Sequence, residues 1–142
     1  MSKLLAGADL RKADGSKHDA KELEVVGLYF SAHWCPPCRQ FTPVLKDFYN
    51  ELHEDGEFEI VFVSFDRSSD DLKKYLQEAH GDWLHIPHGD AKIRELASKF
   101  SVSGIPAFII VKPDGTVITK EGRSDVQGKP PKQALSGWKK SL

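Results

Sequence analysis

Cysteine is scarce in this sequence, and its scarcity limits the roles it can have. Among 142 residues there are only two cysteines, Cys35 and Cys38, inside the segment WCPPC. A structural zinc site takes four protein ligands, and the six histidines show no zinc-finger spacing with this pair. We therefore expect no metal site, and the two thiols must be explained in another way.

The chain also lacks an excess of charge and any long apolar run. Twenty basic and 21 acidic side chains give a formal net charge of -1, so we expect no nucleic-acid or membrane partner. No run approaches the roughly 18 apolar residues of a membrane span, and the N-terminus lacks the apolar region of a secretory signal. We expect a cytosolic or nuclear protein, where a lone permanent disulfide is unusual.

Internal repeats and low-complexity segments are absent as well. A length of 142 residues suits one domain with its own hydrophobic core, so we assign residues 1–142 to a single domain. An Asp-Gly turn signal predicts a short N-terminal hairpin at about residues 9–19, and the core is expected over about residues 24–142. Strand-like and helix-like segments alternate, which predicts an α/β fold.

Apolar periodicity predicts the individual elements. Strands are expected where β-rich apolar runs occur, at residues 25–32, 58–65, 107–111 and 116–119. The segment after the cysteines has a helical apolar face that contains a proline at position 43, and the face consists of Phe41, Val44, Leu45, Phe48 and Leu52. This segment is therefore predicted to be an amphipathic helix.

Three further helices are predicted downstream. One begins at Ser68 with a capping-box pattern and buries Leu72, Tyr75, Leu76 and Ala79. After a loop at residues 81–90, a short helix capped by Asp90 buries Ile93, Leu96, Ala97 and Phe100. A last helix follows Pro130 and Pro131, with Trp138 as its core anchor.

Cys35 stands where a predicted buried strand ends and a predicted helix begins. The unpaired N–H groups and partial positive charge of a helix N-terminus favour its thiolate, the form that attacks disulfides. Cys38 lies one turn later, where it can close a ring with Cys35, and we expect it to be more buried and to keep its proton. The pair predicts dithiol–disulfide exchange through a mixed disulfide, with no cofactor besides its own redox-active disulfide.

Pro36 and Pro37 fit the first helical turn, because the N–H groups of that turn have no partner within the helix. They stiffen the link between the cysteines, and they also remove two N–H donors that could stabilise the Cys35 thiolate. These effects on the reduction potential oppose each other. Five of the histidines are interpreted as solvated surface groups, whereas His33 is either such a group or one that tunes the charge beside the motif.

Several segments together resemble one known superfamily. FSAHWCPPC (30–38), the proline at position 43 and GIPAF (104–108) resemble the thioredoxin superfamily. SAHWCPPCRQFTP, VFVSFDRSSDDLKKYL and WLHIPHGD are most similar to its branch of tryparedoxins and nucleoredoxin-like proteins, over about residues 10–140. The resemblance implies a single-domain thioredoxin fold, with a central mixed sheet flanked by helices and a site beyond the carboxyl end of a central strand.

The resemblance also implies roles for individual residues. Cys35 matches the attacking cysteine and Cys38 the resolving one, and Trp34 matches a tryptophan that flanks and shields the site. Pro106 matches the cis-proline of the family, which turns the backbone of Ile105 towards an extended substrate segment and keeps rival metal ligands away from the thiols. These residues form the expected site.

One position departs from thioredoxins proper. They carry a buried acid six residues before the first cysteine, where this chain has Tyr29. A tyrosine of ordinary pKa, about 10, is a poor base at neutral pH. Deprotonation of Cys38 must then rely on water, on the geometry of the mixed disulfide or on another acid. Asp66, at the end of the second buried strand, is either that acid or a loop aspartate that helps to start the next helix.

Two more residues match positions near the site in this branch. Trp83 is either a site residue or a core or lid aromatic. Arg123 is either a solvated turn residue or a guanidinium that pairs with a carboxylate of a glutathione-like substrate. The implied partners are disulfide-bearing proteins and an upstream reductant, with thioredoxin reductase, glutathione and trypanothione all open, and we expect a monomer.

The sequence leaves more than one function open. The leading hypothesis is a dithiol–disulfide oxidoreductase that reduces protein disulfides. The alternative is a nucleoredoxin-like, redox-gated binding module with low turnover, in which the cysteines serve as a switch. A peroxidase is disfavoured, because peroxidatic cysteines follow a threonine by three residues and Ala32 occupies that position.

Overall fold

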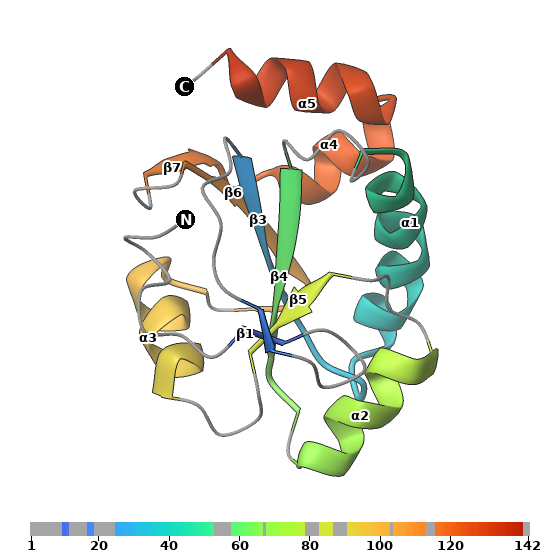
Figure 1. The fold of residues 1–142 in the computed structure, drawn as a ribbon, viewed down its shortest axis with the longest axis vertical. Helices are drawn as coiled ribbons and strands as arrows, with labels where there is room; N and C mark the ends of the chain where they lie inside the picture. The colour runs from blue at the N-terminus through green and yellow to red at the C-terminus, as the bar shows by residue number, and fades with distance from the viewer. Residues whose placement is uncertain are drawn as a thin grey trace.

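The computed structural model describes residues 10–11, 17–18, 25–52, 58–66, 68–78, 83–86, 91–102, 104–112 and 116–140. These residues form one sheet with helices on both faces (Figure 1). The strands are β1 (Leu10–Arg11), β2 (Lys17–His18), β3 (Val25–Ser31), β4 (Phe58–Ser64), β5 (Leu84–His85), β6 (Ala107–Val111) and β7 (Val117–Thr119). The helices are α1 (Pro36–Leu52), α2 (Ser69–Glu78), α3 (Ala91–Lys99), α4 (Gly122–Gly128) and α5 (Pro131–Lys139).

The sheet is mixed, as the sequence predicted. Its strand order is β2-β1-β5-β4-β3-β6-β7, so β3 and β4 lie in the middle. β3 pairs parallel with β4 and antiparallel with β6. Every residue of β3 is buried, because both faces of the central strands are covered, and this explains its uninterrupted apolar sequence. The N-terminal hairpin is present as the antiparallel pair of β1 and β2.

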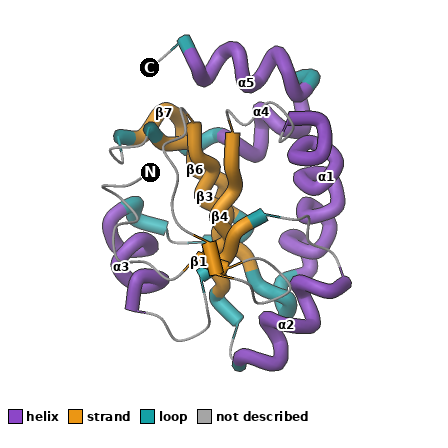
Figure 2. Tube along the Cα trace, in the orientation of Figure 1, coloured by secondary structure: helices purple, strands orange, loops and turns teal. Residues whose placement is uncertain are grey.

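Two hydrophobic clusters lie on opposite faces of the sheet. Figure 2 shows α1 and α2 on one side of the sheet and α3 on the other. One cluster joins Tyr29 and neighbouring strand residues to buried side chains of α1, α2 and α5. The other joins Leu28 and its neighbours to Leu96 of α3. Because side chains alternate along a strand, adjacent residues of β3 enter different clusters. A single α/β domain with two cores follows, in agreement with the predicted fold class.

Helix α1 agrees with its prediction except at one residue. It contains the proline at position 43, and its buried apolar face includes Phe41, Leu45, Phe48 and Leu52. Val44 was expected on that face, but it is 41% exposed. Thr42 and Tyr49 are buried instead. The buried face of α1 is wider than the predicted apolar face, because α2 also packs against this helix.

Two other predictions were wrong in part. The expected loop at residues 81–90 contains strand β5, which pairs parallel with β4. His85 lies in that strand and is only 6% exposed, so its assignment to the solvated surface is corrected. Helix α4 was not predicted, because its sequence GRSDVQG has no periodic apolar face. The predicted Asp90 cap and Ala79 fall outside the described residues.

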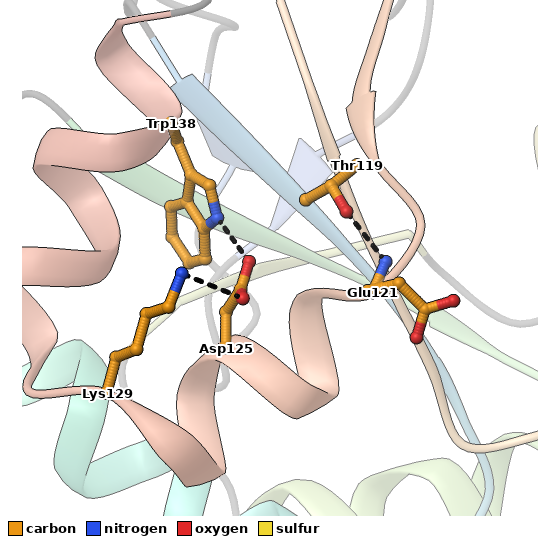
Figure 3. Close-up of polar contacts among 5 residues, drawn as sticks. All are labelled: Thr119, Glu121, Asp125, Lys129 and Trp138. Carbon is orange, nitrogen blue, oxygen red and sulfur yellow. Dashed lines mark hydrogen bonds and ion pairs between the residues drawn. The ribbon is translucent and has the colours of Figure 1, made fainter.

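Helices α4 and α5 are joined by a partly buried hydrogen bond (Figure 3). Trp138 donates its indole N–H to Asp125 Oδ2 at 2.9 Å, and Lys129 Nζ lies 3.5 Å from the other carboxylate oxygen. The Trp138 ring packs on Phe48 and Phe58, as expected for a core anchor. Trp138 thereby fixes α5 against α1 and the sheet.

Candidate active site

The site lies where three strand ends meet. β3 and β4 run parallel and end together at Ser31 and Ser64. β6 runs the other way, and its first residue, Ala107, pairs with Phe30 near the end of β3. The segments that follow β3 and β4 therefore lie beside the segment that precedes β6. This register brings together the cysteine motif, Asp66 and Pro106, which are far apart in the sequence.

The two cysteines occupy the start of α1. The Cys35 carbonyl accepts the first helical hydrogen bond, from the Arg39 N–H at 3.1 Å, so Cys35 is the N-cap residue. Pro36 and Pro37 lie in the first turn of α1, as predicted, and both are exposed. Cys35 is 5% exposed and Cys38 0%, and both are free thiols. The order of burial agrees with the sequence expectation that Cys38 is the more deeply placed.

Burial determines the protonation of Cys38. Desolvation, followed by a hydrogen bond with Cys35, raises the pKa of the Cys38 thiol to about 11. A hydrogen bond from Ser31 acts in the opposite direction and lowers it. At neutral pH Cys38 is therefore a neutral thiol, in agreement with the expectation that it keeps its proton.

The segment before β6 closes one side of the site. The Ile105–Pro106 peptide bond is cis, as the resemblance implied. The Cys35 thiol lies 3.8 Å from the Ile105 carbonyl oxygen, with the sulfur as donor. Ile105 is partly exposed and packs against the small cluster formed by Ala32 and the two cysteines. The backbone of Ile105 is thus adjacent to the more exposed sulfur.

Trp34 is the exposed wall of the site. Its side chain is 48% exposed, although its indole N–H donates to the Phe65 carbonyl at 3.1 Å. Trp34 is therefore held against the loop after β4 while much of its surface remains in solvent. It flanks the cysteines as the resemblance implied.

Arg123 is not a solvated turn residue. It lies in the first turn of α4, is partly buried, and donates from Nη1 to the Pro106 carbonyl at 3.2 Å. Its guanidinium carbon lies 5.6 Å from the centre of the Phe41 ring. Gly122 makes this placement feasible, because a Cβ there would stand 2.8 Å from the Phe108 ring. Arg123 therefore lies beside the cis-proline, and its pairing with a substrate carboxylate stays a prediction.

Trp83 and Tyr29 belong to the core beneath the site. Trp83 is 0% exposed and packs edge-on against Tyr29 and Tyr49, so it is a core aromatic and not a lid. The Tyr29 hydroxyl donates to the Cys38 carbonyl at 3.3 Å, and burial raises its pKa above the ordinary value. Tyr29 thus stays neutral and cannot replace the missing buried acid.

Asp66 ties two loops together. Its Oδ1 accepts the His33 backbone N–H at 2.7 Å, and its Oδ2 accepts the Ser64 hydroxyl at 2.7 Å. The cap of α2 is instead Ser68, whose Oγ accepts the Asp71 N–H at 3.1 Å. Asp66 therefore does not start the next helix, and it holds the segment before Trp34 in place.

Three polar residues at the site were missed by sequence reasoning. Ser31, Thr42 and Tyr75 are all 0% exposed and hydrogen-bond to one another or to Cys38. The sequence predicted Ser31 and Thr42 only as parts of a strand and a helix, and Tyr75 only as part of an apolar helix face. Their hydroxyl groups are visible in the sequence, but the sequence does not show that β3, α1 and α2 bring them together.

The arrangement can carry out thiol chemistry. A less buried sulfur stands at a helix N-terminus, and a second, protonated sulfur lies beneath it. Among the described residues, no group of three or more His, Cys, Asp or Glu side chains is arranged to hold a metal ion. No helix within the described ranges has the length and apolar character needed to span a membrane.

Comparison with known protein families and structures gives a consistent result. A model of a thioredoxin-like family matches residues 22–117. A crystal structure of thioredoxin from Wuchereria bancrofti is 55% identical, with a TM-score of 0.86 and 99% of each chain covered. Tryparedoxin II from C. fasciculata is 35% identical, with a TM-score of 0.82 and 92% of each chain covered.

Nucleoredoxins are similar to this chain over most of its length. Bos taurus nucleoredoxin is 45% identical over 127 residues, which is 87% of this chain. The match covers only 28% of that nucleoredoxin, so the chain spans little more than a quarter of the curated relatives it matches.

Proposed function

Because this chain belongs to the thioredoxin-like family, in the branch of the tryparedoxins and nucleoredoxins, we propose that it is a dithiol–disulfide oxidoreductase that reduces protein disulfides. The observation that carries the proposal is the cysteine pair at the start of α1. Cys35 is the outer sulfur and lies beside the Ile105 carbonyl, whereas Cys38 is buried and protonated. Such a pair supplies both a nucleophile and a resolving thiol.

The reaction consists of two exchanges. The Cys35 thiolate attacks one sulfur of the substrate disulfide, which forms a mixed disulfide and releases the first substrate thiolate to take up a proton. Cys38 then loses its proton and attacks the Cys35 sulfur, and the second substrate thiolate leaves and is protonated. Two electrons pass from the dithiol to the substrate, and no bound cofactor is required.

The first exchange prepares the second. In the dithiol, both a hydrogen bond with Cys35 and the charge of Cys35 raise the pKa of Cys38. Once Cys35 is part of a mixed disulfide, it carries no charge and its sulfur is a weaker partner. These two contributions to the raised pKa of Cys38 then weaken, and the contribution of burial remains. The pKa of Cys38 should therefore fall in the mixed disulfide, so that Cys38 loses its proton more readily at the step in which it attacks.

Insulin reduction tests the proposed activity. With dithiothreitol as electron source, the protein should accelerate the precipitation of reduced insulin well above the rate of dithiothreitol alone. A chain that adds nothing to this background, and that also fails with thioredoxin reductase, glutathione and trypanothione as donors, would contradict the proposal.

A redox-gated binding module is the second candidate, and one observation favours it. Trp34 presents an exposed aromatic side chain beside the thiols. A Cys38→Ser variant in a cell lysate distinguishes the two functions. An oxidoreductase should accumulate many mixed disulfides, whereas a module should retain one or two partners and hold them without covalent bonds too.

Arg123 supports a glutathione-like reductant. Its Nη1 is bound to Pro106, and its buried Nε has no hydrogen-bond partner among the described residues. A carboxylate beside the cis-proline could accept from the remaining guanidinium N–H groups. A related tryparedoxin II has been crystallised in complex with glutathionylspermidine. We propose that the upstream electron donor is a glutathione-containing thiol that Arg123 recognises.

Arg123→Gln is expected to raise the KM for a glutathione-type donor about tenfold, equivalent to about 1.4 kcal/mol, because one charge-assisted contact is lost. Insulin reduction driven by dithiothreitol should change little. Steady-state kinetics with both donors measure the difference. Arg94→Gln on α3 removes an exposed arginine on the opposite face of the sheet and is the matched control. Equal losses with both donors would contradict the assignment.

A further inference from the structure

Four buried hydroxyl groups form a cluster next to the backbone of Cys38. Thr42 of α1 stands at its centre, because Thr42 Oγ1 lies 2.6 Å from the hydroxyl oxygens of both Tyr29 and Tyr75. Ser31 Oγ lies 2.7 Å from the Tyr75 hydroxyl oxygen. All four side chains are 0% exposed. They come from β3, α1 and α2, so this hydroxyl cluster exists only when the three elements are packed together.

The hydroxyl cluster is bound to the carbonyl oxygen of Cys38. Thr42 Oγ1 donates to that oxygen at 2.8 Å. A threonine inside a helix often donates to the carbonyl four residues earlier. The Thr42 oxygen differs from such a threonine because two tyrosine hydroxyls also contact it. The bond from Thr42 to Cys38 is therefore held in place by β3 and α2 and not by α1 alone.

The direction of these hydrogen bonds follows from the number of protons. A hydroxyl donates one hydrogen bond and can accept two, whereas a carbonyl only accepts. Thr42 therefore gives its proton to the Cys38 carbonyl, and both tyrosines donate to Thr42. The Tyr29 proton is shared with the Cys38 carbonyl at 3.3 Å, and Tyr75 accepts from Ser31. Burial raises the pKa of both tyrosines, so they keep the protons that they donate.

The turn of α1 that carries Cys38 lacks one backbone hydrogen bond. Pro43 directly follows Thr42 inside the helix and has no N–H, so it cannot donate to the Arg39 carbonyl. The start of α1 is therefore less firmly tied to the rest of the helix. The hydroxyl cluster instead ties the Cys38 carbonyl to β3 and α2.

We propose that Thr42 is a positioning residue for the resolving cysteine: its hydroxyl, held by Tyr29 and Tyr75, fixes the backbone of Cys38 so that the thiol stays within reach of Cys35. The inference deepens the proposed exchange reaction and rests on it for its place in turnover. A thiol that is already in place acts at a high effective concentration. The two cysteines pack together with Ala32 in one small cluster. Because the hydroxyls bind the carbonyl of Cys38, they can stay in place when its sulfur bonds to Cys35.

A stoichiometric amount of the aromatic disulfide dithiobis(nitrobenzoate) separates the two exchanges. The Cys35 thiolate attacks it, a mixed disulfide forms, and a first coloured thionitrobenzoate leaves. Cys38 then gives its proton to solvent and its sulfur attacks the Cys35 sulfur. The Cys35–Cys38 bond forms, and a second thionitrobenzoate leaves with the electron pair of the broken bond. Stopped-flow absorbance therefore records attack and resolution as two successive releases.

Thr42→Val keeps the shape of the side chain and removes its hydroxyl. The second release should become about tenfold slower, because Cys38 is then less often in place, and the first release should not change. Thr42→Ser keeps a hydroxyl and should restore the second release. Tyr75→Phe leaves Thr42 intact but removes one of its donors, and it should slow the second release by less. Tyr49→Phe, which alters another buried tyrosine of α1, is the control and should change neither release.

The reduction potential gives an independent readout that loss of stability alone would not move. A tenfold lower effective concentration of Cys38 makes the potential of the Cys35–Cys38 pair about 30 mV less negative in Thr42→Val, measured by equilibration with glutathione. An unchanged second release in both Thr42→Val and Tyr75→Phe, or an equal slowing of both releases, would overturn the inference. If the releases change as expected but the unsubstituted protein reduces no insulin, the proposed function fails and the positioning by Thr42 stands.

Discussion

Replacement of Cys35 by serine is expected to abolish the reduction of insulin disulfides, so that the rate falls to that of dithiothreitol alone. A serine hydroxyl is not ionised at neutral pH and cannot form a mixed disulfide, so the first exchange has no nucleophile. Serine is close to cysteine in size, and Cys35 is a helix N-cap position at which serine is favoured. The fold should therefore be retained, and circular dichroism checks this.

The matched control for this variant is Cys38→Ser. It should lose multiple turnover as well, but it should still carry out the first exchange and remain attached to its substrate. The two serine variants thus separate attack from resolution. Full insulin reduction by Cys35→Ser would contradict the assignment of Cys35 as the nucleophile.

Trp138→Ala is expected to lower the free energy of unfolding by about 3–5 kcal/mol, a large part of the total stability of a domain of this size. The Trp138 ring is 3% exposed and packs on Phe48, Phe58 and Phe108, and its indole N–H is paired with Asp125. Its removal leaves a cavity between α5 and the sheet, and the Asp125 carboxylate loses its indole N–H donor. Urea unfolding followed by circular dichroism measures the loss.

Two further variants show how much of this loss in the free energy of unfolding comes from packing and how much from the hydrogen bond. Asp125→Ala removes only the polar partner and should lower the free energy of unfolding by about 1 kcal/mol. Trp34→Ala is the matched control for the loss of an indole ring, because Trp34 is 48% exposed and should contribute little to stability. A Trp138→Ala protein as stable as Trp34→Ala would show that α5 is not anchored as described.

The central strands and α1 could be predicted because the pattern of apolar residues in each sequence indicates which of its faces are buried. A run such as VVGLYFS has no polar face, so it can only be a strand covered on both sides. Val44 shows the limit of periodicity, because a regular apolar spacing does not say how far the buried face extends around the helix. Strand β5 and helix α4 are too short for a periodic signal, and β5 is fixed by its pairing with β4 on one side and β1 on the other.

The residues of the site also differ in whether the sequence alone could predict them. Cys35, Cys38, Trp34 and Pro106 could be found from local motifs, and the structure places them together. Arg123 and the hydroxyls of Ser31, Thr42 and Tyr75 depend on contacts between separate elements. No spacing within one segment predicts that α2 brings a hydroxyl to the end of β3, because the sequence does not fix the packing angle of the helix. The Cys38 environment therefore had to come from the structure.

The most direct test of the central claim is the intact mass of three proteins after exposure to a small disulfide in stoichiometric amount. We expect Cys38→Ser to gain one disulfide-linked adduct on Cys35. The unsubstituted chain should gain none and should instead lose two hydrogens as the Cys35–Cys38 disulfide closes. Cys35→Ser should react far more slowly, because its remaining thiol is buried and protonated. An adduct that forms as fast on Cys35→Ser as on Cys38→Ser would contradict the assignment of attacking and resolving cysteines.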